Sequence, residues 1–176
     1  NWKRPKFEIN SLMNLLVSSL EKEKPSLMEN RIKLNAIGNI KELNENCYNK
    51  LCEVINQTAN NNELTLNLAI SYGSLQEISR AVRKISNKVK NNLISVKNID
   101  QKIINDHLYT RNLPPVDLLI RTGGEYRLSN FLLLQAAYAE LYFTDVLWPD
   151  FRKEDFFDAI VSFQNRERRF GKIKQN

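Results

Sequence analysis

Segments with strand-like patterns alternate with segments of helical periodicity along this chain, and this alternation is the feature that most constrains its fold. Strand patterns cover residues 31–37, 64–72 and 116–120, and Tyr142 and Phe143 are expected to form a last short strand. Helical periodicity covers residues 7–20, 42–59, 77–89, 99–108, 130–139 and a final segment from Phe156 to near Gly171, and Pro25 is expected to end the first helix. The alternation predicts an α/β fold, with a mainly parallel central sheet flanked by helices.

Composition excludes several classes of protein. With 176 residues, 42% hydrophobic and 26% charged, the chain has the length and composition of one folded domain of ordinary size. No apolar run approaches the roughly 20 residues that a membrane-spanning helix needs. Cys47 and Cys52 form neither a disulfide framework nor a zinc-site spacing, so we expect reduced thiols in a cytoplasmic protein.

The net charge of +6 raises the question of a nucleic-acid partner. The basic residues gather in two places, around Lys84, Lys88 and Lys90 and over residues 166–174. Because no aromatic residues interleave with the first cluster, it is interpreted as a solvated helix face, and nucleic-acid binding is disfavoured. For the second cluster, binding of phosphate-containing ligands remains an open alternative.

Chemistry is concentrated after the buried strand pattern 116–120, in the sequence RTGGEYRLSN of residues 121–130. The two glycines allow a tight turn in which backbone N–H groups can approach a ligand. Arg121 and Arg127 bring fork-shaped donors that match phosphate oxygens. Ser129 can cap the following helix, whose N-terminus adds a positive dipole. These features predict a site for a phosphate-containing anion, and two arginines favour a diphosphate; the alternative is a helix cap with surface arginines.

The same stretch disfavours nucleotide-binding loops, because it has neither a Walker sequence nor a Gly-x-Gly-x-x-Gly sequence. Gln135, Tyr138 and Glu140 follow closely along the chain and are expected near one another. A carboxylate beside a diphosphate suggests Mg²⁺, which takes few protein ligands and bridges phosphate oxygens. The alternative interpretation of Glu140 is an ordinary surface residue.

Residues 117–151 resemble the C-terminal signature of the cis-prenyltransferases, the undecaprenyl diphosphate synthase family. The first residues, NWKRP, resemble the family's Asn-Trp-x-Arg-Pro element, and residues 165–171, NRERRFG, resemble its Arg-x-Gly tail. Residues 34–38 and 71–73 are similar to internal strands of the family. The resemblance therefore extends over essentially the whole chain.

The resemblance implies an enzyme that condenses isopentenyl diphosphate onto an allylic diphosphate, farnesyl diphosphate, with cis geometry. The product would be a long-chain polyprenyl (undecaprenyl) diphosphate, the precursor of a lipid carrier for cell-wall synthesis. The wide apolar stripe from Ile9 to Leu20 corresponds to a helix that lines the product tunnel. A homodimer is implied, and so is contact with the inner face of the membrane, with which the positive charge is compatible.

The resemblance also implies roles for individual residues. Glu140 matches the Mg²⁺ ligand, and Asn1 matches an asparagine implicated in proton removal, with a water or phosphate oxygen as the final acceptor because an amide is a poor base. Arg169 and Gly171 match the tail that reaches the partner's site in the family's dimers. The other positions that match substrate-binding residues are Trp2, Arg4, Arg121, Arg127, Leu128 and Ser129.

The chain departs from the family pattern in places. Gly73-Ser74-Leu75 replaces Gly-Gly-Arg, and the family's Asp-Gly-Asn-x-x-Trp-Ala loop is not found in residues 1–176. We therefore expect residues 1–176 to be a single domain, the C-terminal two-thirds or so of a catalytic domain, and inactive alone. The alternative is a non-catalytic partner subunit that binds isopentenyl diphosphate and dimerises; the intact Arg121, Arg127 and Glu140 favour the enzyme.

Overall fold

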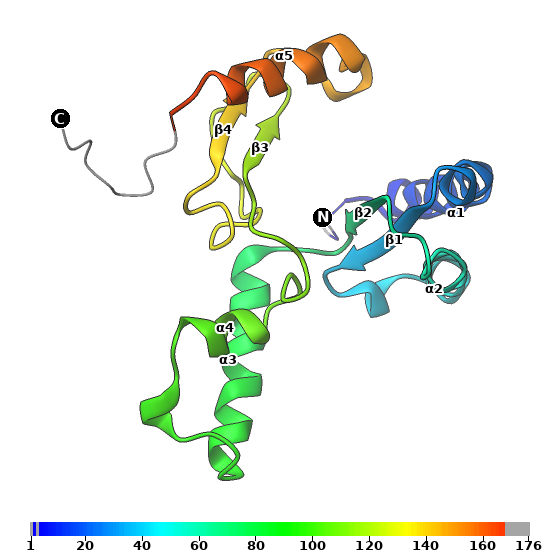
Figure 1. Ribbon diagram of the computed structural model, residues 1–176. Helices are drawn as coiled ribbons and strands as arrows, with labels where there is room; N and C mark the ends of the chain where they lie inside the picture. Colours follow the sequence, from blue (N-terminus) through cyan, green and yellow to red (C-terminus); the bar gives the residue numbers. More distant parts are fainter. Residues whose placement is uncertain (1, 3, 168–176) are drawn as a thin grey trace, which may run out of the picture. The chain divides into compact units, whose positions relative to one another are not determined.

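The computed structural model describes residues 2 and 4–167, and the chain divides into two compact units, Asn1–Arg111 and Asn112–Asn176 (Figure 1). That residues 1–176 form a single domain stays a prediction. No helix in the described part of the chain is both long enough and apolar enough to cross a bilayer.

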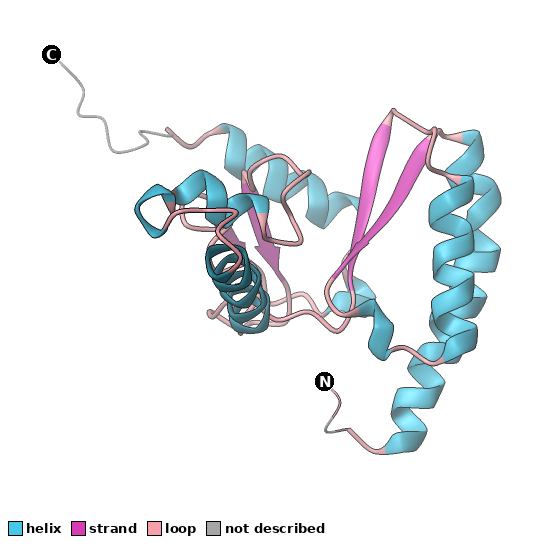
Figure 2. Cartoon of the chain, turned by 90° about the horizontal axis from the view of Figure 1, so that it is seen from below, coloured by secondary structure: helices cyan, strands magenta, loops and turns pink. Residues whose placement is uncertain are grey.

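The first unit contains a pair of parallel strands and four α-helices. In chain order these are α1 (Lys6–Glu29), β1 (Ile32–Ile37), α2 (Glu45–Gln57), β2 (Leu64–Ala69), α3 (Ser74–Lys90) and α4 (Gln101–Asp106), with 3₁₀ turns at Ile40–Glu42 and Val96–Asn98. β1 and β2 pair in register from Ile32 opposite Leu64 to Ile37 opposite Ala69. α1 and α2 pack against each other and against β1 (Figure 2).

The core of this unit lies between α1, α2 and β1. Its buried side chains are Leu20, Leu27, Leu34, Leu51 and Val54. The hydroxyl of Thr58, which is fully buried at this junction, accepts from Leu34 N at 3.0 Å and donates to Val54 O at 2.9 Å. Because this buried hydroxyl is hydrogen-bonded, the cost of removing it from water is offset. The end of α2 is thereby fixed to the start of β1.

The second unit contains β3 (Leu118–Arg121), β4 (Glu140–Phe143), a 3₁₀ turn at Trp148–Asp150 and α5 (Lys153–Gln164). β3 and β4 are parallel, from Leu118 opposite Glu140 to Arg121 opposite Phe143, and α5 packs on β4 (Figure 1). The α/β class and the parallel pairing are thus confirmed. The described strands form two separate parallel pairs, where the sequence pattern predicted one central sheet.

Three predictions about helices are wrong, and one of them is the end of the last helix near Gly171, because α5 ends at Gln164. Pro25 does not end the first helix, because α1 continues through it to Glu29. Residues 130–139 are turns and not a helix. Ser129, Asn130 and Leu132 have φ angles of 47°, 63° and 47°, and a right-handed helix cannot continue through such left-handed residues.

Candidate active site

The carboxyl ends of β1 and β2 are joined backbone to backbone. Ile70 N donates to Ile37 O at 2.9 Å, and Asn39 N donates to Ser71 O at 3.1 Å. Gly38 sits in this junction at φ 104°, and a Cβ added to it would lie 2.1 Å from Ile70 O. Only glycine fits so close an approach at a positive φ. The two loops that follow these strands therefore lie together at the edge where α/β sheets bind ligands.

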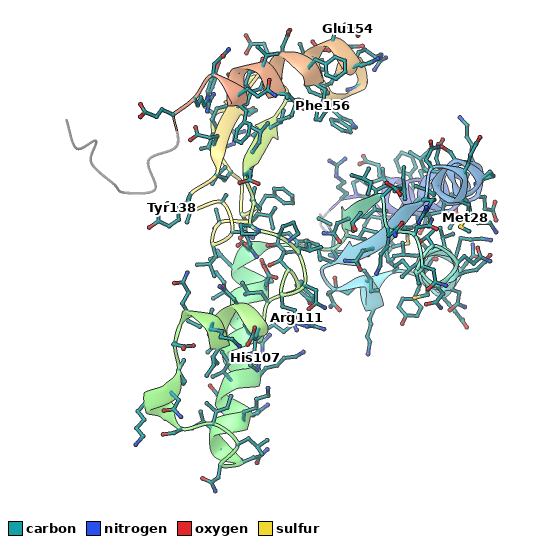
Figure 3. All side chains as sticks on the ribbon, viewed as in Figure 1. Met28, His107, Arg111, Tyr138, Glu154 and Phe156 are labelled. Carbon is teal, nitrogen blue, oxygen red and sulfur yellow. The ribbon has the colours of Figure 1, made fainter. Side chains whose placement is uncertain are left out.

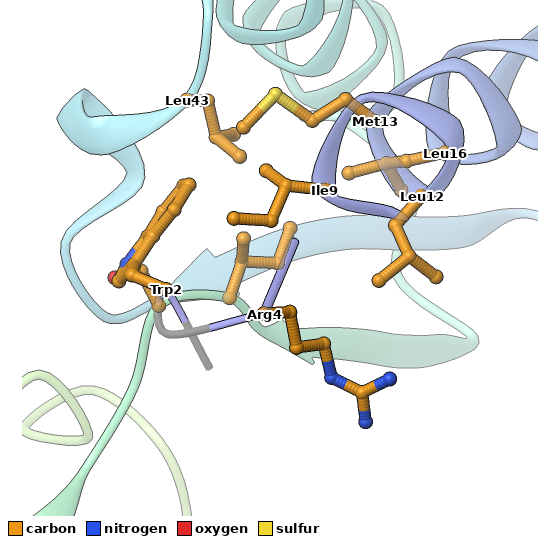
Figure 4. A pocket seen from close by; sticks show the side chains of 9 residues that line it. Trp2, Arg4, Ile9, Leu12, Met13, Leu16 and Leu43 are labelled. Atoms are coloured by element: carbon orange, nitrogen blue, oxygen red, sulfur yellow. The ribbon is translucent and has the colours of Figure 1, made fainter. Parts of the chain in front are cut away.

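An apolar pocket of about 170 Å³ opens beside these loops (Figure 4). Its lining comes from the start of the chain, from the first turns of α1 and from the two loops: Trp2, Arg4, Ile9, Leu12, Met13, Leu16, Leu43, Ile70 and Ser71. The stripe of apolar residues on α1 therefore has two roles. Its first part lines the pocket, whereas Leu20 belongs to the buried core. Such a lining suits a hydrocarbon chain.

Two predicted site residues, Trp2 and Arg4, meet at this pocket. The Trp2 indole forms one side of it, and the Arg4 guanidinium points away from the apolar side chains (Figure 4). Arg4 Nη1 forms an exposed ion pair with Glu8 Oε2 at 3.3 Å. Its charge therefore stands at the pocket's polar side, where it could meet an anionic head group.

Two polar residues behind Trp2, Glu42 and Ser71, were not predicted from the sequence as site residues. Trp2 Nε1 donates to Ser71 Oγ at 2.7 Å, and Ser71 Oγ bonds in turn to Glu42 Oε2. The hydrogen bond from Ser71 keeps the pKa of the Glu42 carboxyl below its ordinary value; burial opposes this shift, and hydrogen bonds from Asn39 and Trp2 add to it. The available signal was positional, since Glu42 follows the strand pattern 31–37 and Ser71 lies at the end of the strand pattern 64–72.

In the second unit, Arg121 at the end of β3 organises the predicted anion loop. Its Nη1 donates to Ser129 Oγ at 2.9 Å and also to the carbonyl oxygen of Arg127. Arg127 Nη1 forms an ion pair with Glu125. A cavity of about 260 Å³ is lined by Leu119, Ile120, Arg121, Thr122, Leu128, Ser129 and Phe131. The structure thus brings Arg121, Leu128 and Ser129 to one cavity, and Arg127 is not among its lining residues.

Two parts of the anion-loop prediction are wrong. The N–H groups of Gly123 and Gly124 do not face a ligand, because they donate to Val146 O at 2.9 Å and to Thr144 O at 3.0 Å. The tight turn itself is confirmed, with φ angles of 86° and 68° at these glycines. No helix dipole supports the loop either, since Ser129 begins a run of turns and not a helix. Positive charge at this cavity comes from the guanidinium of Arg121.

Glu140, the predicted metal ligand, begins β4 and is partly buried. Its Oε2 accepts from Arg166 Nη1 at 3.0 Å, and its other carboxylate oxygen has no partner among the described residues. Mg²⁺ commonly binds one or two carboxylates together with substrate phosphates and water, so one free oxygen fits a single protein ligand. No group of three or more His, Cys, Asp or Glu side chains that could hold a metal gathers within residues 2 and 4–167.

The remaining predicted residues give a mixed outcome. Tyr138 is 74% exposed and points outward, so it does not join Glu140 in a common site (Figure 3). Asn1, Arg169 and Gly171 lie outside the described residues.

Comparison with known proteins finds one family over nearly the whole chain. Residues 1–171 match the family model described as putative undecaprenyl diphosphate synthase. The ditrans,polycis-undecaprenyl-diphosphate synthase ((2E,6E)-farnesyl-diphosphate specific) of Haemophilus influenzae is 49% identical over 171 residues, which cover 97% of this chain and 72% of the relative. An isoprenyl transferase of Clostridium tetani is 43% identical over 98% of this chain and 68% of its own length.

Solved structures agree with this result. The lavandulyl diphosphate synthase of Lavandula x intermedia, in complex with dimethylallyl diphosphate, matches with a TM-score of 0.94 and 35% identity, over 98% of this chain and 75% of that one. A probable undecaprenyl diphosphate synthase of Campylobacter jejuni matches with a TM-score of 0.83 and 38% identity, over 98% and 78% of the two chains. The chain therefore belongs to the undecaprenyl diphosphate synthase family of prenyltransferases.

Proposed function

We propose that this protein condenses isopentenyl diphosphate onto farnesyl diphosphate with cis geometry, and that repeated condensation gives a long-chain polyprenyl diphosphate such as undecaprenyl diphosphate. The observation that carries the proposal is the apolar pocket lined by α1, because a soluble diphosphate alone would need no such lining. Two of the relatives are named as synthases specific for (2E,6E)-farnesyl diphosphate, which supports the choice of allylic substrate.

Each half of the reaction has candidate residues. Arg121 and Ser129, with Arg127 close by in the loop, would bind the diphosphate of isopentenyl diphosphate, and Leu128 would line its cavity. The pocket with Trp2 and Arg4 would hold the farnesyl chain and its head. In the condensation, the allylic C–O bond breaks, a C–C bond forms to the alkene, diphosphate leaves and one proton is lost. Asn1 is the candidate for positioning the water or diphosphate oxygen that takes this proton.

Glu140 is the residue that would hold Mg²⁺, which neutralises the leaving diphosphate when bound. The ion pair with Arg166 orients the Glu140 carboxylate, since Arg166 Nη1 also donates to Leu141 O at 2.9 Å. Arg166 therefore fixes the carboxylate relative to the backbone of β4.

The decisive experiment is incorporation of labelled isopentenyl diphosphate with farnesyl diphosphate and Mg²⁺, using the protein expressed from its complete reading frame and residues 1–176 alone. We expect a lipid-soluble product from the former that is lost with EDTA and in Arg121→Ala. If the protein binds isopentenyl diphosphate but forms no product, the non-catalytic partner subunit replaces the enzyme.

We also propose a cytoplasmic homodimer that touches the inner face of the membrane, with Arg169 and Gly171 reaching the partner's site. Sedimentation equilibrium tests the dimer. Co-sedimentation with phosphatidylglycerol vesicles at low and high salt tests the membrane contact, which a net charge of +6 makes salt-dependent. A monomer, or an absence of vesicle binding at both salt concentrations, would contradict the respective proposal.

A further inference from the structure

Three polar groups from distant parts of the sequence form a directed chain of hydrogen bonds beside the apolar pocket. Trp2 Nε1 can only donate, and an ionised Glu42 carboxylate can only accept. Ser71 therefore accepts from Trp2 at 2.7 Å and donates its own proton to Glu42. The chemistry of the three groups permits this one direction, and Glu42 is its terminal acceptor.

The backbone holds the Ser71–Glu42 end of this chain in place. Asn39 N donates to Ser71 O at 3.1 Å, and Glu42 N donates to Asn39 O at 3.0 Å, which closes the 3₁₀ turn that carries Glu42. Ser71 itself has a φ of 46°, a left-handed conformation that is uncommon for a residue other than glycine. The backbone hydrogen bonds of the two loops therefore hold Glu42 and Ser71 beside each other.

Both side-chain hydrogen-bond partners of the Trp2 indole among the described residues, Ser71 and Glu42 itself, belong to this group. Trp2 precedes α1, its side chain is 43% exposed, and its ring forms one side of the pocket opposite Leu12 and Leu16 (Figure 4). Leu43 and Ile70, the neighbours of Glu42 and Ser71, line the pocket as well. A change in the hydrogen bonds of Ser71 would therefore change the position of the ring that bounds the pocket.

We infer that Glu42 is a positioning residue for the apolar chain of the allylic substrate, because through Ser71 it holds the Trp2 indole as a wall of the pocket. This inference rests on the proposed function for the identity of the chain that is bound. The wall contacts a part of the substrate that does not react, so its loss weakens binding in the ground state and the transition state alike.

The test combines a spectroscopic signal with kinetics on the protein from its complete reading frame. Protein labelled with 5-fluorotryptophan gives a ¹⁹F line for Trp2, assigned by its loss in Trp2→Phe. We expect Glu42→Ala to shift this line and to raise the KM for farnesyl diphosphate about five- to tenfold, with kcat within about twofold. Glu42→Gln keeps an acceptor for the Ser71 hydroxyl. Its KM for farnesyl diphosphate and its Trp2 line should therefore stay close to those of the wild-type protein.

Glu45→Ala is the matched control, because it removes an exposed carboxylate three residues away that has no bond to Ser71. Ser71→Ala breaks the same hydrogen-bond chain from its middle, so it replaces Glu42→Ala if that variant fails to fold. An unchanged KM in the broken variants, or an equal shift of the Trp2 line in Glu45→Ala, overturns the inference. If the wild-type protein makes no product, the proposed function fails. The inference is then decided by whether Glu42→Ala weakens binding of farnesyl thiodiphosphate, which needs no turnover.

Discussion

At the scale of single residues, Arg121 fixes two points of the anion loop with one nitrogen, donating to Ser129 Oγ and to the Arg127 carbonyl. Lysine keeps the charge but not the planar fork. We expect Arg121→Lys to raise the KM for isopentenyl diphosphate about ten- to hundredfold, because a charge-assisted hydrogen bond is worth about 1.5–3 kcal/mol. Steady-state incorporation measures this. Arg83→Lys, an exposed position on α3, is the control and should match wild type; an unchanged KM in Arg121→Lys would refute the role.

Adding a methyl group at Gly38 and at Gly123 allows the cost of backbone strain to be compared with the cost of a steric clash. Both have a positive φ, but a Cβ at Gly38 would meet Ile70 O at 2.1 Å, whereas at Gly123 the nearest atom is Leu147 Cδ2 at 3.9 Å. We expect Gly123→Ala to lower the free energy of unfolding by about 1–2 kcal/mol from backbone strain alone. Gly38→Ala should lower the free energy of unfolding by clearly more, because the junction between the two loops must open to admit the methyl group. Urea unfolding followed by circular dichroism measures the free energy of unfolding of both variants. Equal decreases would show that the junction accommodates the methyl group without further strain.

Glu42 should give stability a pH dependence of defined sign. Its pKa in the folded protein lies below the ordinary value of 4.5, mainly because Ser71 donates to the carboxylate. The stabilisation is therefore fully present above pH 4.5 and is lost as the pH falls through the lower folded pKa. Urea unfolding of wild type and Glu42→Gln across pH 3–7 should show a constant difference at the neutral end that shrinks at the acid end. A stability difference between wild type and Glu42→Gln that grows on acidification would contradict a lowered pKa of Glu42 in the folded protein.

At the scale of elements, α1 carries a proline four positions before its end at Glu29. Proline inside a helix removes one backbone hydrogen bond and crowds the preceding turn. Part of that cost is offset because proline restricts the unfolded chain. We expect Pro25→Ala to raise the free energy of unfolding by about 1–2 kcal/mol. Lys22→Ala, at an exposed position of the same helix, should change it by less than about 0.5 kcal/mol; a destabilised Pro25→Ala would contradict this reasoning.

The elements also show where local sequence reasoning succeeds. Alternating and apolar runs predicted β1, β2 and β3, because the two-residue period of a strand is visible locally. The period could not exclude a helix over residues 130–139, since the left-handed φ angles of Asn130 and Leu132 are not encoded by hydropathy. Pro25 was expected to stop the first helix. The helix continues through it, because α1 packs against α2 and β1.

The contacts of the candidate site also divide into local ones, which the sequence predicted, and long-range ones, which it did not. Arg121 and Ser129 were predicted to act together, and their side chains are hydrogen-bonded, because they lie only eight positions apart in one loop. The Trp2–Ser71 bond spans 69 residues, so its existence depends on which strands pair and could not be read from spacing. Glu42 was missed for that reason. The structure supplies the long-range partners, whereas the sequence supplies the residue types.

At the scale of the whole molecule, the two proposed half-sites lie in different compact units. The apolar pocket belongs to residues 2–71, and the arginine cavity belongs to residues 119–131. The chemistry of the two linings differs, so an uncharged isoprenoid and a small diphosphate should stabilise different segments. A ligand slows amide exchange where it suppresses local opening.

Hydrogen exchange with farnesol and with isopentenyl diphosphate, each added alone, tests this division. We expect farnesol to protect peptides over residues 6–16 and 70–76, and isopentenyl diphosphate to protect those over residues 118–131. Inorganic phosphate at the same concentration controls for general ionic effects and should protect neither set strongly. Equal protection of both sets by either ligand would show that the two linings do not act as separate subsites. In that case the assignment of Trp2 to the hydrocarbon chain and Arg121 to the diphosphate would have to be abandoned.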